Sequence, residues 1–83
     1  MKIWAKILKD EKILKDTIYS KDGRFDKDAF LGYLSEICYS FDIPTPVVIP
    51  SHLDSFLEFN HHKFRPADFV EYVGFDFFEI ENC

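Results

Sequence analysis

The sequence predicts an α+β fold, a small two-layer domain in which one main helix and short helices pack on a mostly antiparallel sheet. Three observations carry this prediction. The chain opens with two apolar-rich runs around a polar break, residues 26–41 follow a helical spacing, and the chain closes with alternating apolar and polar residues. The predicted element order is β-β-α-β-α-α-β. We expect residues 1–83 to form one domain without linker or repeat.

The first run, KIWAKILKDEKILKDTIY, predicts a β-hairpin. Its polar break lacks the glycine that two-residue turns prefer, so we expect a three-residue loop centred on Glu11. That loop would set Lys6 opposite Asp16 and Trp4 opposite Ile18, whereas a slip of one residue would exchange the two faces. In either register both faces carry apolar side chains. One face therefore packs on the core, and the other is at least partly covered or adhesive.

Residues 26–41 predict the main helix. Asp26 is a suitable N-cap because its carboxylate can accept a hydrogen bond from the first helical turn. Apolar residues recur along one stripe at intervals of one, three and four, which is typical of a helix packed on a core. The stripe consists of Ala29, Phe30, Tyr33, Leu34, Ile37, Cys38 and Phe41.

The middle of the chain predicts two shorter elements. Pro44 and Pro46 end the main helix, and the apolar residues 47–49 are expected to form a short edge strand or an extended crossing segment. Ser51 can cap a short helix that follows it.

The last quarter of the chain predicts another short helix and the final strand. Pro66 suits the first turn of a helix over residues 66–73. The final segment, FDFFEIE, alternates, with Phe78 and Ile80 on one face and Phe77 and Glu79 on the other. This pattern is typical of a half-buried strand.

Composition indicates a folded protein of the cytoplasm. Ten Phe, four Tyr and one Trp supply enough aromatic surface for a dense core. The chain has only two cysteines, Cys38 and Cys83, and its N-terminus has lysines in place of an apolar signal core. No apolar run approaches the roughly 20 residues of a membrane span. We expect both thiols to be free and no membrane association.

Charge is distributed unevenly along the chain. Residues 1–24 contain seven basic and four acidic residues, whereas residues 25–83 contain three basic and eleven acidic ones. The net charge is −5 at pH 7. Such asymmetry predicts either two differently charged faces or an ordinary solvated surface.

No catalytic, metal or cofactor signature is found. The candidate ligands His52, His61, His62, Cys38 and Cys83 lack the paired spacing of metal sites, and neighbouring histidines usually point apart. Cys38 falls on the buried helix stripe, which disfavours a nucleophilic role. A chain of this size also has little room for a small-molecule pocket. We expect a protein that is not an enzyme and that has no cofactor, metal or small-molecule substrate.

Three segments resemble an uncharacterised family of short bacterial proteins, about 80–90 residues long, found in Firmicutes. The resemblance covers most of the chain. It rests on KIWAKILKDEKILKDT, on CYSFDIPTPVVI and on FLEFNHHKFRPADFVEYVGFDFFEIE. The family has no assigned activity, so the resemblance implies the architecture and no function. The positions that match the family pattern are Trp4, Phe56, Lys63, Phe64, Arg65, Phe69, Glu71, Asp76, Glu79 and Ile80.

By elimination, the sequence favours a small acidic module that binds another protein without chemistry of its own. One alternative is an acidic inhibitor that occupies the basic nucleic-acid groove of a defence or nuclease effector, of the type carried by phages and mobile elements. A second is local nucleic-acid binding by the lysine-rich hairpin, although the net charge disfavours nucleic acid as a partner. A third is self-association through a sheet edge. The candidate interaction surface consists of Trp4, Lys63, Arg65, Asp68, Glu71, Asp76, Phe77, Glu79 and Glu81.

Overall fold

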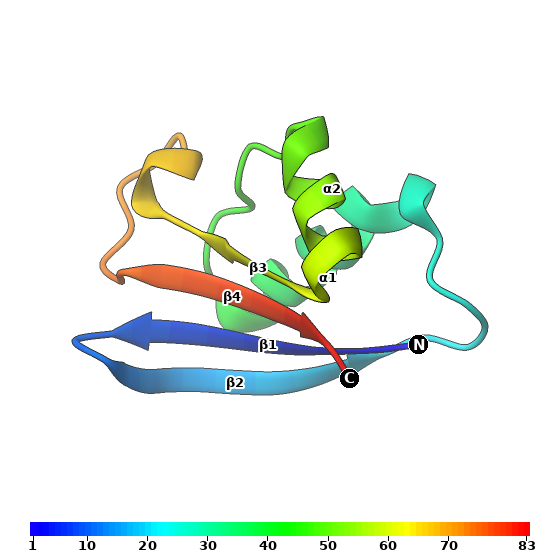
Figure 1. The fold of residues 1–83 in the computed structure, drawn as a ribbon. Coiled ribbons are helices and arrows are strands. Elements are labelled where there is room, and N and C mark those ends of the chain that lie inside the picture. Colours follow the sequence, from blue (N-terminus) through cyan, green and yellow to red (C-terminus); the bar gives the residue numbers. More distant parts are fainter.

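A computed structural model describes residues 1–83 and has two layers, a four-stranded antiparallel sheet and two helices above it (Figure 1). The predicted α+β fold class is confirmed. The strand order is β2-β1-β4-β3, so the first and last strands of the chain lie side by side in the centre. The elements are β1 (Lys2–Lys9), β2 (Lys12–Ser20), η1 (Lys27–Ala29), α1 (Phe30–Phe41), α2 (Pro50–Phe59), β3 (His61–Phe64), η2 (Pro66–Asp68) and β4 (Phe77–Asn82). The labels η1 and η2 denote single turns of 3-10 helix.

The β1–β2 hairpin turns through only two residues, Asp10 and Glu11, whose φ angles of 52° and 65° are left-handed. The predicted three-residue loop is therefore wrong. The pairing of Lys6 with Asp16 is nevertheless as predicted, because Leu14 is an extra residue that bulges out of β2. A two-residue turn plus one bulged residue gives the same register as a three-residue loop.

The main helix, α1, forms where the spacing predicts it. Asp26 caps the preceding turn η1, since its Oδ1 accepts a hydrogen bond from the Asp28 N–H at 2.9 Å. The helix ends at Asp42, which is left-handed with a φ of 57°. Its buried stripe packs on the sheet and consists of Phe30, Tyr33, Leu34, Ile37, Cys38 and Phe41.

The strand predicted at residues 47–49 does not form. Two prolines precede this segment, and its Val47 N–H makes one isolated bond, to the Asp68 carbonyl at 2.8 Å, in place of a ladder. The helix that follows, α2, begins at Pro50, one residue before the predicted cap Ser51. Proline suits this position because its fixed φ is helical and its missing N–H has no partner in a first turn.

The third strand is instead β3, a segment for which the sequence predicts the junction between two helices. Asn60 has a left-handed φ of 62° and reverses the chain directly after α2. β3 then pairs antiparallel with β4, with Phe64 opposite Phe78. The observed order of strands and α-helices is therefore β-β-α-α-β-β, in place of the predicted β-β-α-β-α-α-β. Two strands lie toward each end of the chain.

The helix predicted at residues 66–73 is reduced to the single turn η2. Phe69, directly after this turn, has an extended backbone with φ −108° and ψ 141°. The side chains of Phe69, Val73 and Phe75 are all buried, and the rings of Phe69 and Phe75 pack edge to face with their centroids 5.5 Å apart. Aromatic and β-branched residues also have weak helix propensity, so burial determines the local conformation.

The core lies between the sheet and the helices. Phe78 of β4 is at its centre, with its ring 5.7 Å from that of Phe64 and 6.4 Å from that of Phe41. Neither α1 nor α2 combines the length and apolar character that crossing a bilayer requires.

Candidate functional site

The lower face of the sheet is not covered by any other element. Both helices lie above the sheet, and nothing packs beneath the four strands (Figure 1). The register determines which side chains point to this side. We call it the outer sheet face, and it consists of Trp4, Lys6 and Leu8 of β1, Ile13, Asp16 and Ile18 of β2, Phe77, Glu79 and Glu81 of β4, and His61 and Lys63 of β3.

Trp4 is fixed in the centre of the outer sheet face by polar contacts. Its indole N–H donates to Oδ2 of Asp16 at 3.0 Å. The Nζ of Lys6 lies 3.7 Å from the centroid of the Trp4 ring and 3.1 Å from Oε1 of Glu79. As a result Lys6 is only 7% exposed, although no other element covers it. The face therefore presents an aromatic side chain that is ordered before any partner binds.

Apolar side chains surround this network. Ile13 and Ile18 on β2 are 50% and 53% exposed. At the hairpin end, Leu8 and Phe77 line a shallow depression of about 450 Å³ together with Lys63, whose Nζ lies 5.1 Å from the centroid of the Phe77 ring. The outer sheet face thus combines exposed apolar area with a small number of ordered charges, as protein interfaces do.

Five of the predicted interaction residues lie together on the outer sheet face, namely Trp4, Lys63, Phe77, Glu79 and Glu81. The sequence indicated the alternation in β1 but did not identify which face the helices cover. It therefore missed six members of the face, Lys6, Leu8, Ile13, Asp16, Ile18 and His61.

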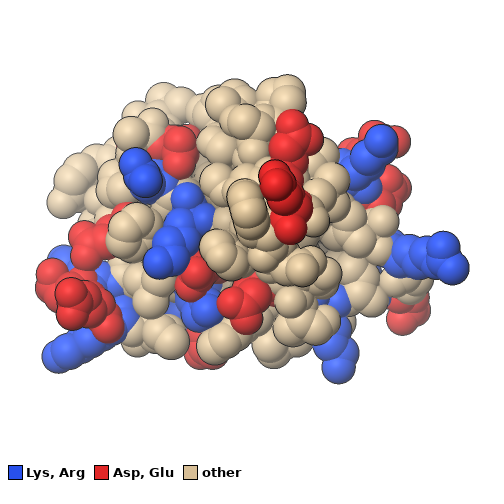
Figure 2. All heavy atoms as spheres, viewed as in Figure 1, with Lys and Arg blue, Asp and Glu red and all other residues tan.

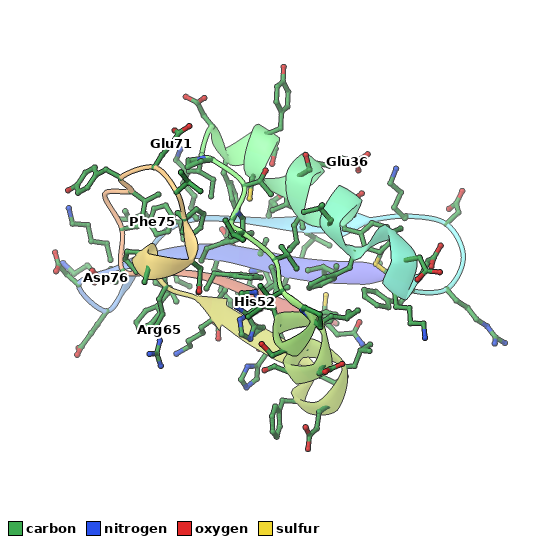
Figure 3. All side chains as sticks on the ribbon, turned by 90° about the horizontal axis from the view of Figure 1, so that it is seen from above. Glu36, His52, Arg65, Glu71, Phe75 and Asp76 are labelled. Carbon is green, nitrogen blue, oxygen red and sulfur yellow. The ribbon has the colours of Figure 1, made fainter.

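The other four predicted residues do not join this surface. Arg65 and Glu71 lie on opposite sides of the molecule when it is seen from above (Figure 3). Oδ2 of Asp68 accepts a hydrogen bond from the Arg65 N–H at 2.8 Å, and Oδ2 of Asp76 accepts one from the Asp10 N–H, also at 2.8 Å. These two carboxylates stabilise turns. Acidic and basic side chains are interspersed over the view in Figure 2, with no large area of one sign.

A second polar cluster lies on the helix side of the sheet, where α2 packs on β3. The rings of His52 and His62 are 4.9 Å apart. Nδ1 of His62 is 3.1 Å from Oγ of Ser55, while its buried Nε2 has no hydrogen-bond partner. Nε2 of His52 lies 3.7 Å from Oδ1 of Asp68. His61 points to the opposite face, so the two neighbouring histidines diverge as predicted. The approach of His52 to His62 is a tertiary contact that the sequence did not reveal.

Burial and the neighbouring His52 lower the pKa of His62 from its ordinary value of 6.5. Above pH 6.5 the residue is neutral in both the folded and the unfolded chain and contributes no pH dependence. As the pH falls through 6.5, the unfolded chain binds a proton that the folded chain does not, so stability decreases. We therefore expect stability to fall as the pH decreases below about 6.5, and His62→Gln to weaken this dependence.

Urea unfolding at several pH values measures this effect. His61→Gln is the matched control because His61 is the adjacent histidine and is exposed on the outer sheet face. We expect the control to keep the pH profile of the wild type. An unchanged profile in His62→Gln would contradict the prediction.

Cys38 is fully buried on the α1 stripe, as predicted. Burial raises the pKa of its thiol to about 12, with a smaller opposing contribution from a hydrogen bond to Thr45. The thiol therefore stays protonated at neutral pH and is shielded from solvent.

Comparisons of the chain with protein-family models, with curated proteins and with solved structures found no match. The resemblance to the family of short bacterial proteins therefore stays a prediction. The fold and the outer sheet face define a small α+β domain with one open sheet surface.

Proposed function

We propose that this protein is a non-catalytic protein–protein interaction module that binds through its outer sheet face. One observation carries the proposal. The face has no covering element, yet it presents an ordered tryptophan among exposed apolar residues. A sheet face that folding leaves partly apolar gains free energy when a partner removes it from water.

The fixed conformation of the Trp4 side chain adds to this argument. Binding is opposed by the conformational entropy of side chains that become fixed at an interface. Trp4 is held by Asp16 and Lys6 within the free chain, so this cost is small for the largest side chain of the face. Tryptophan is also among the residues that contribute most to measured binding energies.

The contacts within the chain give less support to the two alternatives. An acidic inhibitor needs carboxylates that are free to contact a basic groove, but Asp68, Asp76 and Glu79 already have partners inside the chain. Local nucleic-acid binding needs hairpin lysines on one face. Lys6 lies on the outer sheet face, whereas Nζ of Lys15 donates to the carbonyl of Phe41 at 3.0 Å on the helix side.

The test compares two substitutions of equally exposed apolar residues. Ile18→Lys places a charge on the outer sheet face, and Leu31→Lys places one on α1, where Leu31 is 56% exposed against 53% for Ile18. We expect Ile18→Lys to abolish retention of a partner when tagged protein is incubated with a lysate of the cells that make it. Leu31→Lys should retain the partner as the wild type does.

Circular dichroism checks that both variants fold. Equal retention by the two variants would exclude the outer sheet face as the binding surface, because a buried lysine is strongly unfavourable in an apolar interface.

A further inference from the structure

A row of four charged residues crosses the outer sheet face with alternating sign. The register places Asp16 of β2, Lys6 of β1, Glu79 of β4 and Lys63 of β3 directly opposite one another, from one edge of the sheet to the other. The order of charges along the row is therefore negative, positive, negative, positive.

Only the inner two charges pair within the chain. Lys6 and Glu79 form an ion pair at 3.1 Å. Asp16 accepts the indole N–H of Trp4, and Lys63 lies over the ring of Phe77, but neither has an oppositely charged group within ion-pair distance. They are separated by three strand spacings, or about 14 Å, so they cannot pair with each other in one chain.

We propose that the partner of the outer sheet face is a second copy of this chain, packed face to face about a two-fold axis parallel to the strands. This inference rests on the proposed function and names its partner. The axis sets β2 against β3 of the second copy and β1 against its β4. The row then meets its own complement: Asp16 faces Lys63 of the second copy, and Lys6 faces its Glu79.

The same axis also matches apolar residues at the hairpin end, where Leu8 faces Phe77 of the second copy. An in-plane axis perpendicular to the strands would instead bring each strand onto itself and set Asp16 against Asp16, which is repulsive. Pairing through the edge of β2 is disfavoured by the bulge at Leu14 and by the lysines along that strand, which are devices that protect edges. Charge complementarity therefore favours the face and selects one axis.

The size of the face predicts a reversible dimer. Four strands span about 19 Å, and the strands are up to about 25 Å long, so each copy buries on the order of 500 Å². The total of about 1,000 Å² is at the lower limit of specific interfaces. We expect self-association over a range of about 10 to 500 µM protein, in which micromolar affinities are measured.

Exchange of the outer charges provides the decisive experiment. Lys63→Asp alone sets each Asp16 against one carboxylate of the second copy, and Asp16→Lys alone sets each Lys63 against one ammonium group of the second copy. We expect each variant to be monomeric in sedimentation velocity at concentrations where the wild type dimerises. An equimolar mixture of the two should dimerise again, because both contacts are then between opposite charges. Since these residues cannot meet within one chain, recovery can arise only between copies.

Lys27→Asp and Asp54→Lys are matched controls, because they make the same charge changes at exposed positions on the helix side. Both should dimerise as the wild type does. Trp4 is the single tryptophan, so the wild type offers an independent measurement that needs no substitution. Acrylamide quenching of its fluorescence should decrease as protein concentration rises.

A wild type that stays monomeric up to about 500 µM, with concentration-independent quenching, would overturn the proposed dimer. A mixture of Lys63→Asp and Asp16→Lys that stays monomeric would overturn it as well. Neither result decides the broader proposal, because Ile18-dependent retention of a different protein is measured separately.

Discussion

Replacing Phe78 with alanine is expected to lower the free energy of unfolding by about 4 kcal/mol, the largest effect of any single substitution proposed for this chain. Phe78 is completely buried, and its ring packs against those of Phe64 on the neighbouring strand β3 and of Phe41 on α1. Removal of the ring leaves a cavity between the sheet and α1 that two other aromatic rings cannot fill without leaving their own positions. A domain of this length has a total stability of about 4 to 12 kcal/mol, so the variant should be largely unfolded or close to it.

Phe59→Ala is the matched control for this prediction. It removes the same atoms from a ring that is 59% exposed at the end of α2. We expect its stability to change by no more than about 1 kcal/mol, since most of that ring is already in water. Urea unfolding followed by circular dichroism measures both variants. Similar losses in the two would show that burial of Phe78 does not determine its contribution.

The sequence predicted those elements whose signals are local. The α1 stripe and its Asp26 cap depend on residues within a few positions of one another, and both form as predicted. The hairpin register was also correct, although by a different route. The turn at Asp10 and Glu11 adopts left-handed angles without glycine, and the bulge at Leu14 restores the pairing. Asp76 accepts a hydrogen bond from the Asp10 N–H and stabilises this turn from a distant position in the chain.

The errors occur where distant residues determine the conformation. β3 forms because β4 offers it an open edge, and the residue opposite Phe64 is Phe78, which follows it by fourteen positions. The polar segment His61–Phe64 carries no strong strand signal of its own. The predicted helix at residues 66–73 does not continue beyond η2, and the rings of Phe69 and Phe75, six positions apart, pack edge to face in the core.

The candidate site was predictable only in part, because some of its features follow from local alternation and others from contacts between distant strands. Alternation along β1 shows that Trp4, Lys6 and Leu8 share a face, but the sequence does not show on which side of the sheet α1 and α2 pack. The charge row is visible only once β4 is known to lie beside β1. Its residues come from four strands, and the first of them, Lys6, and the last, Glu79, are 73 positions apart in the chain.

Replacing Lys6 with methionine is expected to lower the free energy of unfolding by about 3 kcal/mol. Lys6 and Glu79 have side chains that are only 9% and 13% exposed, so loss of the ammonium leaves a poorly hydrated carboxylate without its partner. Methionine keeps most of the side-chain volume, which limits the loss to electrostatics and to the contact with Trp4. Lys9→Met at the exposed end of β1 is the control, and we expect it to change stability by no more than about 0.5 kcal/mol.

The double variant Lys6→Met with Glu79→Gln separates the two causes. If the unpaired carboxylate is responsible, neutralising it should recover most of the lost stability, because a neutral amide is less costly to bury than a charge. The cation–π contact with Trp4 is still absent in the double variant, and its absence should account for about 1 kcal/mol of the stability that is not recovered. The measurement is urea unfolding of the wild type, Lys6→Met, Lys9→Met and the double variant. A low protein concentration keeps the proposed dimer dissociated. A loss below about 1 kcal/mol in Lys6→Met would contradict this prediction. It would mean that Lys63, the cross-strand neighbour of Glu79, replaces Lys6 in the ion pair. Lys63 of that variant would then no longer carry the free charge on which face-to-face pairing depends.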